Sequence, residues 1–228
     1  MSVADLARSV AERLPEIAVV RDRSRALAVL DAILCPDPDF RYYSYTATWA
    51  DGEELATMAD GSGNDYAIVF SPAGVYAQGF DHESPLSPYR DPDSREVWPG
   101  LLDGLPAVFV HNLEEPAFWD EEDTPRITAC FWRETSDSAW RTGNPEPLPP
   151  GEVADDSASW LFGILTEGPE AFQEWAEDYY ETTVDIEAVR HVCALRPLTE
   201  AVVAQLNPEA SLADLAETLT SIGYPASE

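Results

Sequence analysis

The sequence contains 228 residues, of which 45% are hydrophobic and 11% aromatic, so the chain can bury a core and global disorder is excluded. Its 43 acidic residues stand against only 13 basic ones, all of them arginine, which gives a formal net charge of −30. The absence of lysine excludes Schiff-base chemistry and the phosphate-binding loop that ends in Gly-Lys-Ser/Thr.

The acidic excess lies in the later part of the chain. Residues 1–31 contain five arginines and five acidic residues, so the whole net charge belongs to residues 32–228. Such a surface repels phosphate backbones and anionic lipid, and we therefore expect no direct binding to nucleic acid or membrane. The same field attracts a basic protein partner. The alternative is that the charge only keeps the protein soluble.

The sequence shows no targeting or disulfide signal. No apolar stretch has the length of a signal peptide or a membrane span, so we expect a cytoplasmic protein. The cysteines, Cys35, Cys130 and Cys193, are odd in number and widely separated, which fits neither a disulfide framework nor a Cys-x-x-Cys zinc site. We expect them to be reduced core residues, and we expect no cofactor.

Two helical patterns come first in the chain. Ser2 and Asp5 have the spacing of a capping box, and apolar residues then recur at helical spacing until Pro15. A second apolar stripe follows Ser24 and ends before Pro36. These patterns predict two N-terminal helices.

From Phe40 the apolar period changes to two, which is typical of strands. Short turns at 51–52, 60–64 and 71–74 separate four runs rich in β-forming residues. Because short turns join antiparallel neighbours, the sequence predicts a four-stranded meander over residues 40–80.

The middle of the chain is less regular. Residues 81–100 are rich in proline and predict a long surface connection. An apolar run at 107–110 and an alternating run at 127–133 predict one or two further strands, with His111 at a strand end. Prolines between 145 and 150 predict a stiff linker.

Helical patterns return after this linker. Pro169 stands at the first position of one predicted helix. The last helix has the clearest signals, because Ser211 and Asp214 form a capping pair, Gly223 is a stop signal and Pro225 follows it.

The order of these elements predicts an α+β fold. We expect N-terminal helices, a central antiparallel meander extended by one or two later strands, and C-terminal helices packed on the sheet. Neither the first nor the last third of the chain would bury its apolar face alone. We therefore expect one domain over residues 1–228, with a sub-boundary near 145–152 as the alternative.

The most polar cluster follows the fourth predicted strand. Asp81, His82 and Glu83 stand together there, and Arg90 follows in the same loop. A carboxylate and an imidazole at a strand end are suited to bind a divalent metal or a small ligand, or to act as an acid/base pair. Neighbouring residues of an extended chain point in opposite directions, however, so Asp81 and His82 need a turn to converge.

An acidic stretch that contains two aromatic residues is the first candidate partner surface. Aromatic anchors amid charges opposite to those of the partner suit a protein interface. The alternative is a solvated loop with Phe118 and Trp119 folded inward. The candidate residues of this stretch are Glu114, Glu115, Trp119, Asp120, Glu121, Glu122 and Asp123.

A second acidic surface lies on the helix that begins at Pro169. Its spacing places Trp175 and Tyr179 toward the core. The residues expected to remain outside include Glu177, Tyr180 and Glu181.

Four segments resemble a family of uncharacterised, acidic cytoplasmic proteins from bacteria with high-GC genomes. The resemblance spans most of the chain and implies no particular activity. The general plan of an acidic α+β protein with N-terminal helices also resembles immunity proteins that neutralise polymorphic toxins. The four segments are Gly63-Asn64-Asp65-Tyr66, Phe80-Asp81-His82-Glu83-Ser84, Cys130-Phe131-Trp132-Arg133 and Leu206-Asn207-Pro208.

Three functions remain open at this point. The first is a non-catalytic, acidic protein-binding module, most concretely an immunity or antitoxin-type inhibitor of a basic toxin. The second is a metal-dependent enzyme or small-ligand binder centred on residues 81–90. The third is a DNA mimic whose carboxylates occupy a nucleic-acid-binding protein. The oligomeric state does not follow from the sequence.

Overall fold

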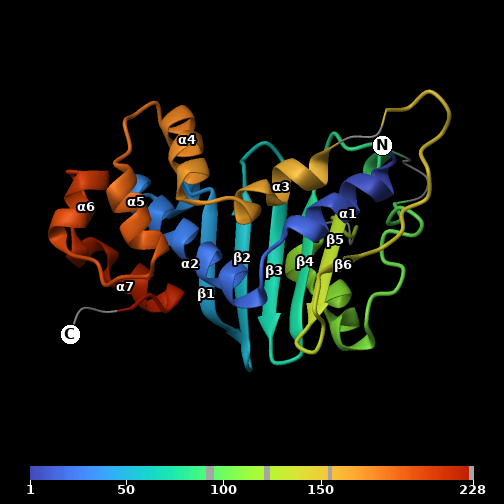
Figure 1. Ribbon diagram of the computed structural model, residues 1–228, viewed down its shortest axis with the longest axis horizontal. Helices are drawn as coiled ribbons and strands as arrows, with labels where there is room; N and C mark the ends of the chain where they lie inside the picture. The colour runs from blue at the N-terminus through green and yellow to red at the C-terminus, as the bar shows by residue number, and fades with distance from the viewer. Residues whose placement is uncertain (91–94, 121–123, 154–155, 226–228) are drawn as a thin grey trace.

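A six-stranded antiparallel sheet forms the centre of the molecule (Figure 1). The structure, a computed structural model, describes residues 1–90, 95–120, 124–153 and 156–225. The strands follow one another in chain order, so the sheet is a meander with β1 at one edge and β6 at the other. The strands are β1 (Tyr43–Ala50), β2 (Glu53–Ala59), β3 (Asp65–Ser71), β4 (Gly74–Phe80), β5 (Ala129–Glu134) and β6 (Arg141–Thr142).

Helices precede and follow this meander, which confirms the predicted α+β fold. Short 3₁₀ segments occur in the connections: η1 (Pro38–Phe40), η2 (Pro88–Arg90), η3 (Ala107–Glu114) and η4 (Pro116–Phe118). The α-helices are α1 (Val3–Arg13), α2 (Ile17–Leu34), α3 (Ser157–Thr166), α4 (Pro169–Tyr179), α5 (Ile186–Cys193), α6 (Glu200–Leu206) and α7 (Leu212–Ile222).

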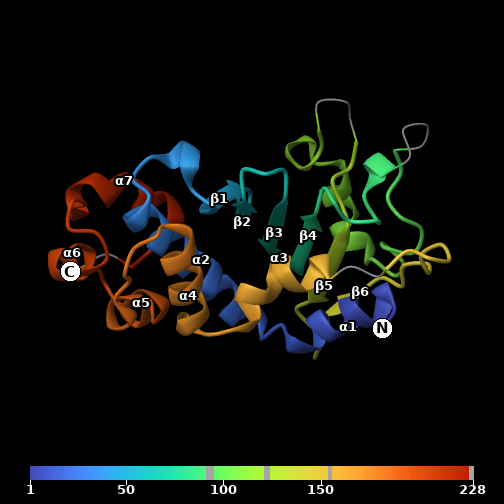
Figure 2. The same ribbon diagram turned by 90° about the horizontal axis from the view of Figure 1, so that it is seen from above.

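Helices α1, α2 and α3 cover one face of the sheet (Figure 2). The strand register places Tyr43, Met58 and Tyr66 side by side on this face, where they join the main core cluster. That cluster also takes side chains from α4 to α7, which gather beyond the β1 end of the sheet (Figure 1).

The segment between β4 and β5 covers the opposite face over the later strands (Figure 2). Residues 107–114 form the helix η3, so the prediction of a strand at 107–110 and of a strand end at His111 was wrong. Phe109 is buried against this face while Val108 and Val110 are exposed. A run of four apolar residues fits a short helix as well as a strand, and Pro106 precedes this helix at the N-cap position without a side-chain hydrogen bond.

The last helix returns to the first strand. The C-terminus of α7 is stopped by Gly223, whose φ of 68° is a left-handed conformation that suits glycine. A Cβ placed on Gly223 would lie 3.0 Å from the Cβ of Ala47, so α7 closes against β1 at this residue. None of the described helices combines the length and the apolar character needed to cross a membrane.

Candidate functional site

The polar cluster after β4 is built into local hydrogen bonds. The Asp81 carboxylate accepts the Glu83 N–H at 2.9 Å and the indole N–H of Trp160 at 3.2 Å. His82 points elsewhere, because its Nδ1 lies 2.7 Å from the Asn64 side-chain oxygen. Glu83 is largely exposed. The Asp81 carboxylate and the His82 ring therefore have separate partners, while the His82 Nε2 lies 4.0 Å from the Glu83 carboxylate.

Arg90 is likewise separate from this cluster. Its guanidinium donates to the carbonyl of Pro85 at 2.7 Å, lies over the Trp98 ring and faces Glu152 at 3.7 Å. Among the described residues, no group of three or more His, Cys, Asp or Glu side chains is arranged to hold a metal ion.

The acidic aromatic stretch folds its aromatic side chains inward. Phe118 packs against the sheet, and Trp119 packs beside it and donates its indole N–H to the Leu113 carbonyl at 2.9 Å. Of the two alternatives for this stretch, the structure therefore has the one with Phe118 and Trp119 folded inward, and Trp119 is not a free aromatic anchor. Glu114 is exposed, whereas Glu115 accepts the Ala117 N–H within the same turn.

Asp120 also has local partners, since it accepts the Thr124 N–H at 2.7 Å and the Tyr89 hydroxyl at 2.6 Å. The two bonds use different carboxylate oxygens, and the Arg95 guanidinium lies 3.9 Å from one of these oxygens. The remaining predicted residues of the stretch, Glu121, Glu122 and Asp123, lie outside the described residues.

The surface of α4 differs from its prediction in its tyrosines. Tyr179 is 46% exposed and stacks on Trp175, whereas Tyr180 turns inward and donates its hydroxyl to Asp31. The prediction of Tyr180 outside and Tyr179 inside was wrong, because the helix ends at Tyr179 and the next residue follows the turn. Glu181 is exposed, while Glu177 accepts the Val184 N–H at 3.0 Å.

Asp31 is the one acidic residue among the fully buried side chains of the described chain, with none of its surface exposed. Burial raises the pKa of its carboxyl above the ordinary value, and hydrogen bonds from Tyr180 and from the Tyr43 N–H offset part of this rise. The bond from the Tyr43 N–H is 2.8 Å long. Asp31 thereby fixes the start of β1 to α2 and α4.

The outer edge of β1 carries backbone groups that the sheet does not use. Ala59 donates to the Tyr42 carbonyl, so the register makes Ser44 and Thr46 the next residues paired with β2. In an antiparallel ladder the intervening residues direct their backbone groups outward. The Asp31 carboxylate accepts a hydrogen bond from the outward N–H of Tyr43. No described group forms a hydrogen bond with the N–H or the carbonyl of Tyr45.

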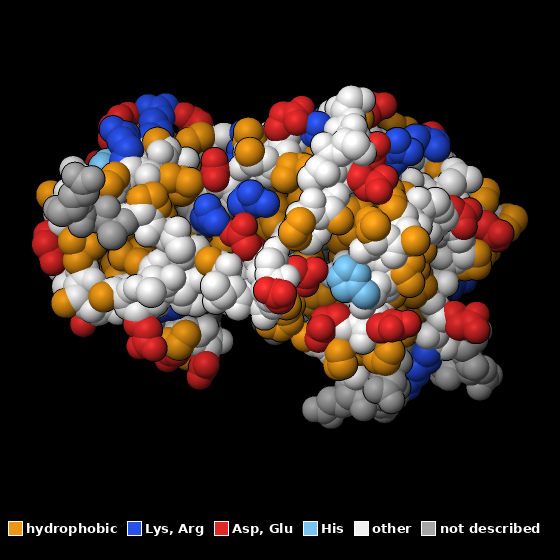
Figure 3. All heavy atoms as spheres, turned by 90° about the horizontal axis from the view of Figure 1, so that it is seen from below, with side chains coloured by type: hydrophobic (Ala, Val, Ile, Leu, Met, Phe, Trp, Pro, Cys, Tyr) orange, Lys and Arg blue, Asp and Glu red, His pale blue; other side chains and the backbone are white. Residues whose placement is uncertain are grey.

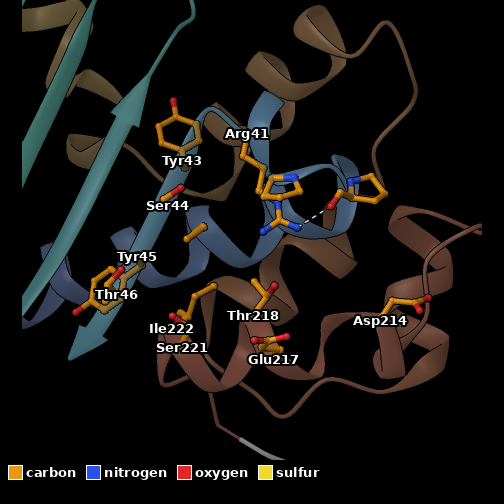
Figure 4. A pocket seen from close by; sticks show the side chains of 13 residues that line it. Arg41, Tyr43, Ser44, Tyr45, Thr46, Asp214, Glu217, Thr218, Ser221 and Ile222 are labelled. Carbon is orange, nitrogen blue, oxygen red and sulfur yellow. Dashed lines mark hydrogen bonds between the residues drawn. The ribbon is translucent and has the colours of Figure 1, made fainter. Parts of the chain in front are cut away.

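A groove of about 510 Å³ lies along this edge, between β1 and α7 (Figure 4). Its lining from β1 runs over Tyr43–Thr46, and α7 contributes polar side chains including Glu217 and Thr218. Arg41 reaches into the groove, where its guanidinium donates to the carbonyls of Cys35 at 3.0 Å and Pro36 at 2.9 Å (Figure 4).

Acidic side chains and one exposed aromatic ring lie on the two segments that line the groove, residues 36–41 and α7. Phe40 is 71% exposed, with Asp37 and Asp39 exposed beside it in and before η1. On the opposite wall, Asp214 and Glu217 are exposed on α7. We refer to the groove with Asp37, Asp39, Phe40, Arg41, Asp214 and Glu217 as the edge groove.

Seen from below, a notch separates the end of the molecule that holds η1 and the C-terminal helices from the part of the chain that follows β4, and acidic side chains stand on both sides of it (Figure 3). On the sheet face opposite α1 to α3, Ser44 is exposed and Thr46 and Thr57 are half-buried. The uncovered part of this face is therefore polar and bears hydroxyl groups.

The edge groove was not predicted from the sequence. It depends on α7 returning to β1 across more than half of the chain, which no local pattern reports. One signal was present, since two prolines with alternating aspartates precede Phe40 and hold that short segment away from the core.

Comparisons with protein-family models, with curated proteins and with solved structures found no match to this chain.

Proposed function

We propose that the protein is a non-catalytic binding protein that engages a basic protein partner through the edge groove. The most concrete form of this function is that of an immunity or antitoxin-type inhibitor, which covers the basic active surface of a toxin. The observation that carries the proposal is an open groove lined by Asp214 and Glu217, next to a short segment on which Phe40 is 71% exposed between exposed acids.

The composition of the edge groove suits this role. Interface energy concentrates in aromatic anchors surrounded by polar residues, and Phe40 is the most exposed aromatic side chain among the described ones. The surrounding carboxylates and the net charge of −30 attract a basic surface and repel an acidic one. Binding should therefore be fast and should weaken as salt rises.

The test is affinity capture of the partner from a lysate of the source organism, followed by affinity measurements with the purified partner. One variant carries Asp39→Asn with Glu217→Gln, since both carboxylates are exposed and neither caps a helix. A second variant carries Phe40→Ser. The control carries Glu12→Gln with Asp103→Asn, two exposed acids elsewhere, and changes the net charge equally.

We expect the first variant to bind about fivefold more weakly than the control, because each exposed ion pair contributes about 0.2–1 kcal/mol. Phe40→Ser should weaken binding at least as much without lowering the melting temperature. Raising salt from about 0.1 M to about 1 M should weaken all complexes, since the Debye length falls from about 10 Å to about 3 Å. A partner whose affinity is the same for all variants and indifferent to salt would refute the proposal.

A further inference from the structure

The unused backbone groups of Tyr45 face the edge groove, and this suggests how a partner binds. We propose that the groove takes an extended basic segment of the partner, which adds to the sheet as a strand beside β1. This inference rests on the proposed function and specifies its mode of recognition. Strand addition uses main-chain hydrogen bonds for affinity and alternate side chains for specificity.

The geometry limits where such a strand can pair. Beyond Tyr45 the edge is closed, because α7 ends against Ala47 and the register of β1 with β2 shifts between Thr46 and Ala50. At the other end, Asp31 already holds the N–H of Tyr43. The carbonyl of Tyr43 and both backbone groups of Tyr45 remain, which suits a segment of about three residues at the strand rise of roughly 3.3 Å per residue.

The charges select a basic segment. Glu217 and Asp214 line the α7 wall of the groove, and the exposed Asp37 and Asp39 alternate in sequence with Pro36 and Pro38, which line it. The single cation in the groove, Arg41, is turned toward the carbonyls of Cys35 and Pro36. A second copy of this chain would bring a like-charged rim and a net charge of −30 to the same place, so repulsion opposes pairing of two β1 edges.

The test selects binders for the full-length protein from a displayed library of random heptapeptides. We expect the selected peptides to carry arginine or lysine at alternate positions. A chosen peptide is then added to the labelled protein, and amide hydrogen exchange is followed residue by residue. The Tyr45 amide should exchange at least tenfold more slowly with peptide bound, while the amides of Ser44 and Thr46, already paired with β2, should change little.

A charge reversal provides the matched comparison. Glu217→Arg should weaken peptide binding about tenfold, and Glu12→Arg, which changes the net charge equally on α1, should leave it nearly unchanged. Basic peptides that bind without protecting Tyr45 would overturn strand addition but leave the proposed function standing. Acidic or uncharged selected peptides, or none at all, would overturn both.

Two further results would also overturn the inference. Tyr45 is only 4% exposed, so full protection of its amide without any peptide would mean that the fold already closes this edge to a partner. Protection that appears only as protein concentration rises, together with a dimer in sedimentation, would mean that a second copy pairs with β1.

Discussion

The hydrogen bond between Tyr180 and Asp31 gives the clearest quantitative prediction. Tyr180→Phe removes the hydroxyl and leaves a fully buried carboxylate with one donor fewer. A hydrogen bond to a charged group contributes about 1.5–3 kcal/mol, so we expect a loss of about 2 kcal/mol in the free energy of unfolding. For a chain of this size, that corresponds to a fall of about 4–8 °C in melting temperature.

The loss should also depend on pH. Since the pKa of Asp31 is raised, the folded state binds its proton more tightly than the unfolded state. The stability that this group contributes therefore falls as pH rises from the pKa of the unfolded state through the pKa of the folded state. Tyr180→Phe removes a bond that lowers this pKa, so it raises the pKa further and widens this pH range. The destabilisation should therefore be largest near neutral pH and should shrink as Asp31 is protonated.

Urea unfolding followed by tryptophan fluorescence at several pH values measures both effects. The matched control is Tyr179→Phe, whose ring is 46% exposed, and we expect its stability to change by less than about 0.5 kcal/mol. Equal losses for the two variants, or a Tyr180→Phe loss that stays constant with pH, would refute the role given to Asp31.

Three further predictions concern the turns, the cysteines and the last helix. Gly74→Ala should lower the free energy of unfolding in urea by more than about 3 kcal/mol, because the new Cβ would lie 2.1 Å from the Arg133 carbonyl oxygen and the φ of Gly74 is 141°. Gly61→Ala, which has open space around it, should lower this free energy by about 1 kcal/mol. Equal losses for the two variants would contradict this prediction. Burial raises the pKa of the Cys130 thiol to about 12, so iodoacetamide at about pH 8 should leave it unmodified until the protein unfolds, and rapid labelling of the folded protein would argue against its burial. Ser211→Ala should lower stability by about 1 kcal/mol in thermal unfolding by removing the cap of α7, and an unchanged melting temperature would show that the cap contributes nothing.

Local signals in the sequence predicted most of the fold. The capping box of Ser2 and Asp5 marks the start of α1, and Ser211 with Gly223 marks both ends of α7, because each of these residues satisfies backbone groups within one turn. The meander was predictable for the same reason, since each of its turns joins neighbouring strands. The helix η3 was not, because a short apolar run has no period long enough to separate helix from strand.

The candidate site followed from the sequence only in its chemistry. Acids beside aromatic residues were expected, but Trp119 is engaged in a small core and Tyr180 binds Asp31. Phe40, which is exposed, was expected only to begin a strand. Which of several acidic aromatic segments stays accessible depends on contacts between distant elements, and those contacts are not encoded in spacing along the chain.

The edge of β1 connects the acidity of the chain with its fold. An open strand edge is a template for pairing with other chains, and proteins protect such edges with covering elements, irregular register or charge. This chain uses all three, because α7 covers Ala47, the register shifts after Thr46, and exposed acids flank the rest. Acidic charge, unlike the other two, discriminates between partners, because it opposes the approach of a like-charged copy and not that of a basic segment. Strand addition thus needs the backbone groups of Tyr45, a residue only 4% exposed, to be reached from the groove, which is what the hydrogen-exchange experiment measures.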